Sequence, residues 1–206
     1  MRWLPIIIGL GILAALWGGP LRAASAHSFA AHMAIHMGVV ALVAPLIASG
    51  VAGTRYDPSP RHPILFGPLP TSLFELIIVW AWHVPVLHGA ARANGWLFAV
   101  EQASFLAAGL LVWIACLGFA AGAQGRRSLA GTIGLLLTSI HMTLLGALLA
   151  FAGRPLYAHA GHGEPAVQIA DQQLGGIIML FIGGAVYLGG GLYLMARVLL
   201  AEERPA

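Results

Sequence analysis

The segment HMAIHM, His32–Met37, carries the residues of this chain whose types and spacing are most typical of metal binding. Its two histidines and its two methionines are each four residues apart, so on a helix each pair lies on one face, about 40° from alignment. Imidazole nitrogens and thioether sulfurs together suit copper, and the thioethers of Met33 and Met37 favour Cu(I). The alternative is that His32 and His36 are hydrogen-bonded core residues and that the methionines fill gaps in the packing. We favour the metal site because other segments carry further histidines.

The elements that must position these residues are apolar helices. The chain has 206 residues, of which 59% are hydrophobic and 8% are charged, whereas a soluble domain has about 25% charged residues. The single cysteine, Cys116, excludes an internal disulfide. We therefore predict an all-α polytopic transmembrane bundle in the lipid bilayer, and no run of basic residues suggests binding to nucleic acid. Six apolar segments are long enough, or nearly so, to cross a bilayer: 4–19, 28–52, 71–90, 96–121, 128–152 and 172–199.

Residues 1–26 have two interpretations. Arg2 precedes the first apolar segment, and Ala24-Ser25-Ala26 fits a signal-peptidase site. Residues 1–26 are therefore either a cleaved signal peptide or a first transmembrane helix, and residues 27–206 form the transmembrane domain in both cases. The bundle has six spans if this segment is retained and five if it is cleaved.

The arginines predict the orientation, because positively charged residues gather on the cytoplasmic side. With both termini in the cytoplasm, seven arginines fall inside and three outside. In this arrangement eight of the nine histidines lie in the outer half or at its surface, and His62 is the exception. The seven are Arg2, Arg55, Arg61, Arg126, Arg127, Arg197 and Arg204; the three are Arg22, Arg92 and Arg154.

Two other segments bring histidine to the predicted outer half. His83 and His88 flank Pro85, which breaks or kinks its helix. Five residues apart, they cannot share a face of a regular helix, so we expect His83 to point into the bundle. The alternative is a histidine within an interfacial aromatic belt. His141-Met142 repeats the His-Met pair in a later helix, where a buried histidine needs a partner.

The outer loop and the last helix add three candidates. His159 and His162, three residues apart, could capture metal from outside, although for this segment we favour the alternative of a solvated polar loop. Asp171 opens the last predicted span, where it could cap the helix and orient a ligating histidine. Glu75 and Glu101 are either structural or relay protons.

Several motifs occur in the order seen in one known family. HMAIHM, WHVPVLH, EQASFLAAGLLVW, HMTLLGALLAF and ADQQLGGIIM resemble the CtaG family of membrane-integral cytochrome c oxidase assembly factors of the caa-type branch. The resemblance runs from about residue 28 to 195. It implies a polytopic protein of the bacterial plasma membrane, needed to form active oxidase, that handles copper. Two positions depart from the family pattern, Gln102 in place of His and Leu180 in place of Trp. The positions of this chain that match the motifs of the family, and to which the resemblance assigns the family's functional roles, are His32, Met33, His36, Met37, His83, His141, Asp171 and Gln172.

Three functions remain open at this point. The first is an assembly factor that holds copper, as Cu(I), near the outer surface and passes it to subunits of a haem–copper oxidase or to other assembly factors. His32, His36, His83 and His141 would bind the metal, with Met33, Met37 and Met142 as soft ligands. The second is a haem b electron carrier with histidine axial ligands, and the third is a copper or proton transporter. No nucleophile arrangement predicts an enzyme.

Overall fold

The computed structural model describes residues 3–118, 124–157 and 164–202, and these form helices joined by turns and loops, with no strand among them. Two π-helical segments, η1 (Gly38–Val43) and η2 (Met179–Gly183), join α3 to α4 and α9 to α10 without a break. The all-α prediction is confirmed. The helices are α1 (Trp3–Gly18), α2 (Pro20–Ala24), α3 (Phe29–Met37), α4 (Ala44–Val51), α5 (Pro68–Trp82), α6 (Pro85–Ala93), α7 (Gly95–Leu117), α8 (Gln124–Ala150), α9 (Pro165–Ile178) and α10 (Gly184–Glu202).

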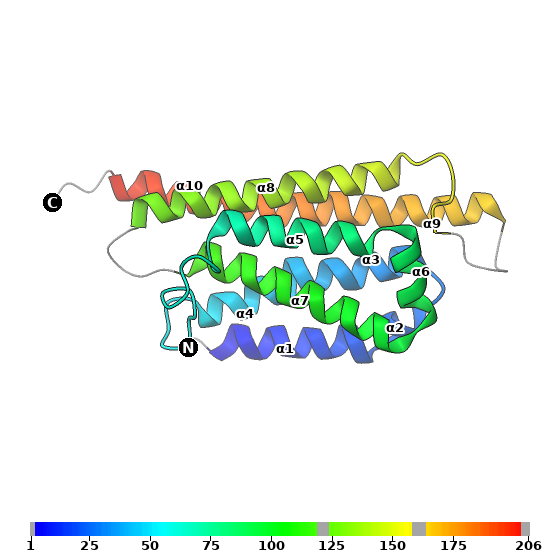
Figure 1. Ribbon diagram of the computed structural model, residues 1–206, viewed down its shortest axis with the longest axis horizontal. Coiled ribbons are helices and arrows are strands. Elements are labelled where there is room, and N and C mark those ends of the chain that lie inside the picture. Colours follow the sequence, from blue (N-terminus) through cyan, green and yellow to red (C-terminus); the bar gives the residue numbers. More distant parts are fainter. Residues whose placement is uncertain (1–2, 119–123, 158–163, 203–206) are drawn as a thin grey trace.

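The long helices run up and down the same axis as an antiparallel bundle (Figure 1). The start of α1 and the end of α10 lie at one end of the bundle, and α2, α6 and the start of α9 lie at the other. We call this second end the site end, because the predicted ligands gather there. Helix α1 packs against α4 and η1, with Gly9 buried. Cleavage after Ala26 stays a prediction.

Four helical stretches of the described chain are long and apolar enough to cross a membrane, so the protein is a multi-pass membrane protein. They are Phe29–Val51, Gly95–Leu117, Ser128–Ala150 and Pro165–Leu200. The α5–α6 pair is a fifth only if both helices count as one span, because they are bent by 72°. Helix α1 has 16 residues, fewer than the roughly 20 that a perpendicular span needs. The predicted six spans are therefore four or five by this criterion.

Local sequence explains where the helices at the site end begin. Ser28 caps α3, since its hydroxyl accepts a hydrogen bond from the Ala31 amide. Asn94 caps α7 and accepts from Trp96 and Leu97. The last helix begins at Pro165, earlier than predicted, because proline suits the first helical turn.

Small residues allow helices α8 and α9 to approach closely. A Cβ at Gly176 would lie 2.7 Å from the Gly146 carbonyl oxygen and 2.5 Å from the Ala150 nitrogen. A Cβ at Gly175 would lie 2.5 Å from the ring of Phe29 on α3. The absence of side chains at these two positions lets α9 pack against both neighbours.

Candidate metal centre

Three buried side chains from three helices meet at the site end. His32 comes from α3, His88 from α6 and Glu101 from α7, and each offers a ligand atom within 4.8 Å of the others. His32 Nε2 lies 3.3 Å from Glu101 Oε1, and the His32 and His88 rings meet edge to face with centroids 4.8 Å apart. Their exposed fractions are 1%, 2% and 0%. Two imidazoles and a carboxylate, closed off from solvent, form a set that could hold a divalent or monovalent transition-metal ion.

The bend between α5 and α6 explains how His88 reaches this group. Pro85 begins α6 after a break at His83 and Val84, and the 72° bend turns α6 across the end of the bundle. His83 and His88 are therefore both buried, at 6% and 2% exposure. The prediction that only one of them points inward is wrong, because it assumed a regular helix.

A second group, called here the deeper group, contains His36, which lies one helical turn further along α3 than His32, together with Met33 and His83. His83 Nδ1 lies 2.6 Å from the Val79 carbonyl oxygen, which can only accept, so Nδ1 carries the ring proton. In the neutral ring, Nε2 then presents its lone pair to the Met33 sulfur, 3.3 Å away. Two lone-pair donors thus face each other in an apolar core without a proton between them.

His36 completes the deeper group. Its ring centroid is 5.6 Å from that of His83 and 3.9 Å from that of Phe105, and the residue is fully buried. Among the described residues neither ring nitrogen of His36 has a hydrogen-bond partner. A buried polar group without a partner is costly, so these nitrogens are available to a bound ion.

The structure also buries His141, Met142 and Met37 in the bundle. His141, on α8, is buried and within electrostatic range of His36, and its ring nitrogens also lack a partner among the described residues. Met142 and Met37 both pack beside Gly183 in η2. Met33 packs beside Gly175 of α9 and its sulfur also lies against His83.

Asp171 and Gln172 contact backbone rather than imidazole. Asp171 accepts hydrogen bonds from Ser28 Oγ (2.7 Å) and from the Phe29 amide (2.6 Å), and so caps α3 from α9. Gln172 accepts from the Leu156 amide at 2.7 Å and fixes the segment after α8. The predicted capping thus applies to α3 and not to Asp171's own helix, because α9 begins earlier than expected. The predicted metal-capture pair, His159 and His162, lies outside the described residues.

Three residues of the site are missing from the predicted ligand set. His88 and Glu101 were noted in the sequence, but their convergence depends on the bend at Pro85 and on the packing of α7. Tyr157 follows α8; its hydroxyl donates to the His83 carbonyl oxygen at 2.8 Å, and its ring stacks on Phe29 with centroids 4.3 Å apart. Burial raises the pKa of the Tyr157 hydroxyl, so it stays a neutral donor. A tyrosine in a loop carried no pattern that could have revealed this.

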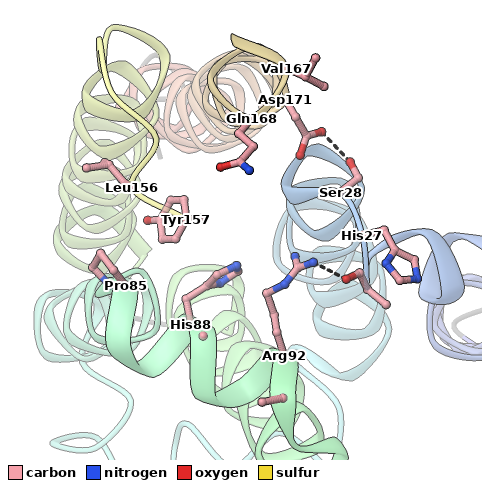
Figure 2. Close-up of a pocket in the computed structure, with 13 residues that line it drawn as sticks. His27, Ser28, Pro85, His88, Arg92, Leu156, Tyr157, Val167, Gln168 and Asp171 are labelled. Atoms are coloured by element: carbon pink, nitrogen blue, oxygen red, sulfur yellow. Dashed lines mark hydrogen bonds between the residues drawn. The ribbon is translucent and has the colours of Figure 1, made fainter. Parts of the chain in front are cut away.

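The group of His32, His88 and Glu101 is called here the upper group. A cavity of about 630 Å³ at the site end reaches this group through His88 (Figure 2). His88 and Arg92 project into it from α6, Asp171 and Gln168 lie opposite on α9, and Tyr157 lies at one side. His88 therefore belongs both to the cavity wall and to the group with His32 and Glu101. His88 is the residue of this group that lines the cavity.

These features define a class first: a multi-pass helical membrane protein with a buried, histidine-rich site near one end of its bundle. Within this class, the chain belongs to the family of cytochrome c oxidase caa3 assembly factors, which it matches over residues 1–200. The resemblance to the CtaG family is confirmed, and the protein is an oxidase assembly factor of this family. No curated protein and no solved structure matches the chain.

Proposed function

We propose that this assembly factor binds copper as Cu(I) at its site end and passes the ion to a haem–copper oxidase. The observation that carries the proposal is the pair of lone-pair donors, His83 Nε2 and Met33 Sδ, which face each other at 3.3 Å. A thioether beside an imidazole is a donor set for a soft ion, and burial excludes water from it. His36, whose ring nitrogens have no hydrogen-bond partner among the described residues, supplies the next ligand through its unprotonated nitrogen.

The two groups would act in sequence. His32, His88 and Glu101 include a carboxylate, a harder ligand, and one of them lines the cavity. The deeper group offers the thioether and excludes solvent. An ion entering through the cavity would meet the upper group first, and its affinity for sulfur would favour the deeper group if it is Cu(I). We expect His141 to contribute from α8 when the ion is bound.

The remaining parts of the proposal concern location and partners. We infer that the protein lies in the bacterial plasma membrane with both termini in the cytoplasm, since the arginine distribution favours that orientation. The site end would then face the periplasm. Its partners would be oxidase subunits or other assembly factors, and it would act by holding and releasing metal rather than by catalysis.

Copper loading of the purified full-length protein tests the proposal. Wild type and the variants His36→Ala, His83→Ala and His62→Ala would be titrated with Cu(I) against a competing chelator, with circular dichroism as a check on folding. His62 is exposed and belongs to the segment between α4 and α5, which lies at the end of the bundle opposite the site end, so its variant is the matched control (Figure 1). We expect wild type and His62→Ala to bind copper equally. His36→Ala and His83→Ala should lose at least about 100-fold in affinity, because even outer-shell partners contribute up to that much.

Two results would overturn the proposal. One is a folded wild type that binds no Cu(I) above the level of the double variant His36→Ala/His83→Ala. The other is a Soret absorption band in the purified protein, which would favour the haem b alternative. Accumulation of copper inside vesicles that contain the protein would favour the transporter instead.

A further inference from the structure

A second buried polar cluster lies deeper in the bundle and involves none of the proposed copper ligands. Its centre is Glu75 on α5, whose side chain is fully buried. Oε1 accepts a hydrogen bond from the Tyr187 hydroxyl at 2.6 Å, and Oε2 has no hydrogen-bond partner among the described residues. No arginine or histidine of the described chain lies within ion-pair distance of this carboxyl group.

The groups that act on Glu75 come from α7, α8 and α10. Tyr187 of α10 and Cys116 of α7 are the titratable groups that act on it. Helix α8 contributes the Thr138 hydroxyl, which lies 2.8 Å from the Ser72 hydroxyl and is also a hydrogen-bonding neighbour of the Glu75 carboxyl group. None of these neighbours carries a positive charge.

The Val40 carbonyl in η1 is the remaining oxygen of the cluster, and it is also engaged. It accepts a hydrogen bond from Trp113 Nε1 at 3.0 Å, and it lies 3.3 Å from the Tyr187 hydroxyl, whose single proton is shared with the closer Glu75 carboxylate. An alkali ion needs several oxygen ligands, whereas Glu75 Oε2 is the one oxygen of this cluster that has no hydrogen-bond partner in the described chain. A proton needs only the carboxylate.

An ionised carboxylate in these surroundings would be unfavourable. It would lie in the interior of a membrane bundle with only neutral hydroxyl neighbours and no counter-charge, where ionised groups cost several kcal/mol. Uptake of one proton by the carboxylate yields a neutral carboxylic acid and removes that cost. We propose that Glu75 is a proton-binding site of this protein. In this proposal the Tyr187 hydroxyl donates a hydrogen bond to Oε1, and the other oxygen, Oε2, takes up the proton.

This site is separate from the proposed copper centre. Glu75 lies two helical turns from His83, about 12 Å along α5. The proposal therefore stands or fails independently of copper binding and can be tested on the metal-free protein.

Infrared difference spectroscopy of the full-length protein in detergent tests it directly. The spectrum of Glu75→Gln would be subtracted from that of wild type at pH 7, where a glutamate with an ordinary pKa of about 4.3 is ionised. We expect a carboxylic-acid C=O band in the difference, and this band should shift in D₂O. The same subtraction with Glu164→Gln, an exposed glutamate, is the matched control and should show carboxylate bands instead.

A second variant tests the assigned partner. Tyr187→Phe removes the hydroxyl that donates to Glu75, so the C=O band should persist and move to higher frequency. Carboxylate bands for Glu75 at pH 7 would overturn the proposal, and if they depended on added Na⁺ they would indicate a cation site. A band unaffected by Tyr187→Phe would overturn the role of Tyr187.

Discussion

The role of Asp171 offers the sharpest quantitative test of the structure. The sequence suggested that the Asp171 carboxylate orients a ligating histidine. In the structure this carboxylate, which belongs to α9, contacts the first turn of α3. It accepts from Ser28 Oγ and from the amides of Phe29 and Ala30, at 2.7, 2.6 and 3.4 Å. The perturbation is Asp171→Ala, which removes all three bonds, with Asp171→Asn as the graded variant.

The expected magnitude follows from these three bonds. Hydrogen bonds to an ionised group contribute about 1.5–3 kcal/mol each, so the two short bonds set an upper range of roughly 3–6 kcal/mol. Asp171 also lines the cavity, so water can replace part of what is lost. We therefore expect Asp171→Ala to lower the free energy of unfolding by about 2–4 kcal/mol. Asp171→Asn keeps one acceptor oxygen and should cost about half as much.

The assay is reversible unfolding of the full-length protein in mixed detergent micelles, followed by circular dichroism, alongside the Cu(I) titration. Glu164→Ala is the matched control, because Glu164 is an exposed carboxylate at the start of α9 with no capping hydrogen bond from its side chain. Its free energy of unfolding should change by less than about 0.5 kcal/mol.

One outcome would refute the capping argument. If Asp171→Ala leaves the free energy of unfolding within about 0.5 kcal/mol of wild type, the three bonds do not stabilise α3. If the same variant also loses copper affinity, the orienting role predicted from the sequence is the correct one.

Two further predictions concern packing and ligand softness. Gly176→Ala should lower the free energy of unfolding by about 1–3 kcal/mol, because its Cβ would meet backbone atoms of α8. Gly189→Ala is the control, because its Cβ would meet nothing within 4 Å, and it should leave the free energy of unfolding unchanged or raise it by up to about 1 kcal/mol. Equal losses of stability in the two variants would contradict the close approach of α8 and α9. Met33→Leu should weaken Cu(I) binding at least about 10-fold while costing less than about 1.5 kcal/mol in stability. Unchanged Cu(I) affinity in the chelator titration would exclude the thioether as a ligand.

Much of the fold and part of the site could be predicted from the sequence because they depend on local patterns. Long apolar segments with few charges require backbone hydrogen bonds to close within each segment, which makes helices the solution. The four-residue spacing in His32–Met37 places two imidazoles on one helical face in any bundle, and Pro85 marks a helix break. The order of motifs indicated the family that the match over residues 1–200 confirms.

Only the tertiary structure decided which of these residues meet. The bend at Pro85 has a magnitude and direction set by packing at the site end, and it turns His88 toward Glu101 on a different helix. Asp171 caps α3 rather than its own helix, because the early start of α9 places it beside Ser28. Tyr187 reaches Glu75 across 112 positions of the chain. The spacing of residues fixes contacts within one helix, whereas contacts between helices depend on bends, caps and close approach, and these are properties of the packed bundle.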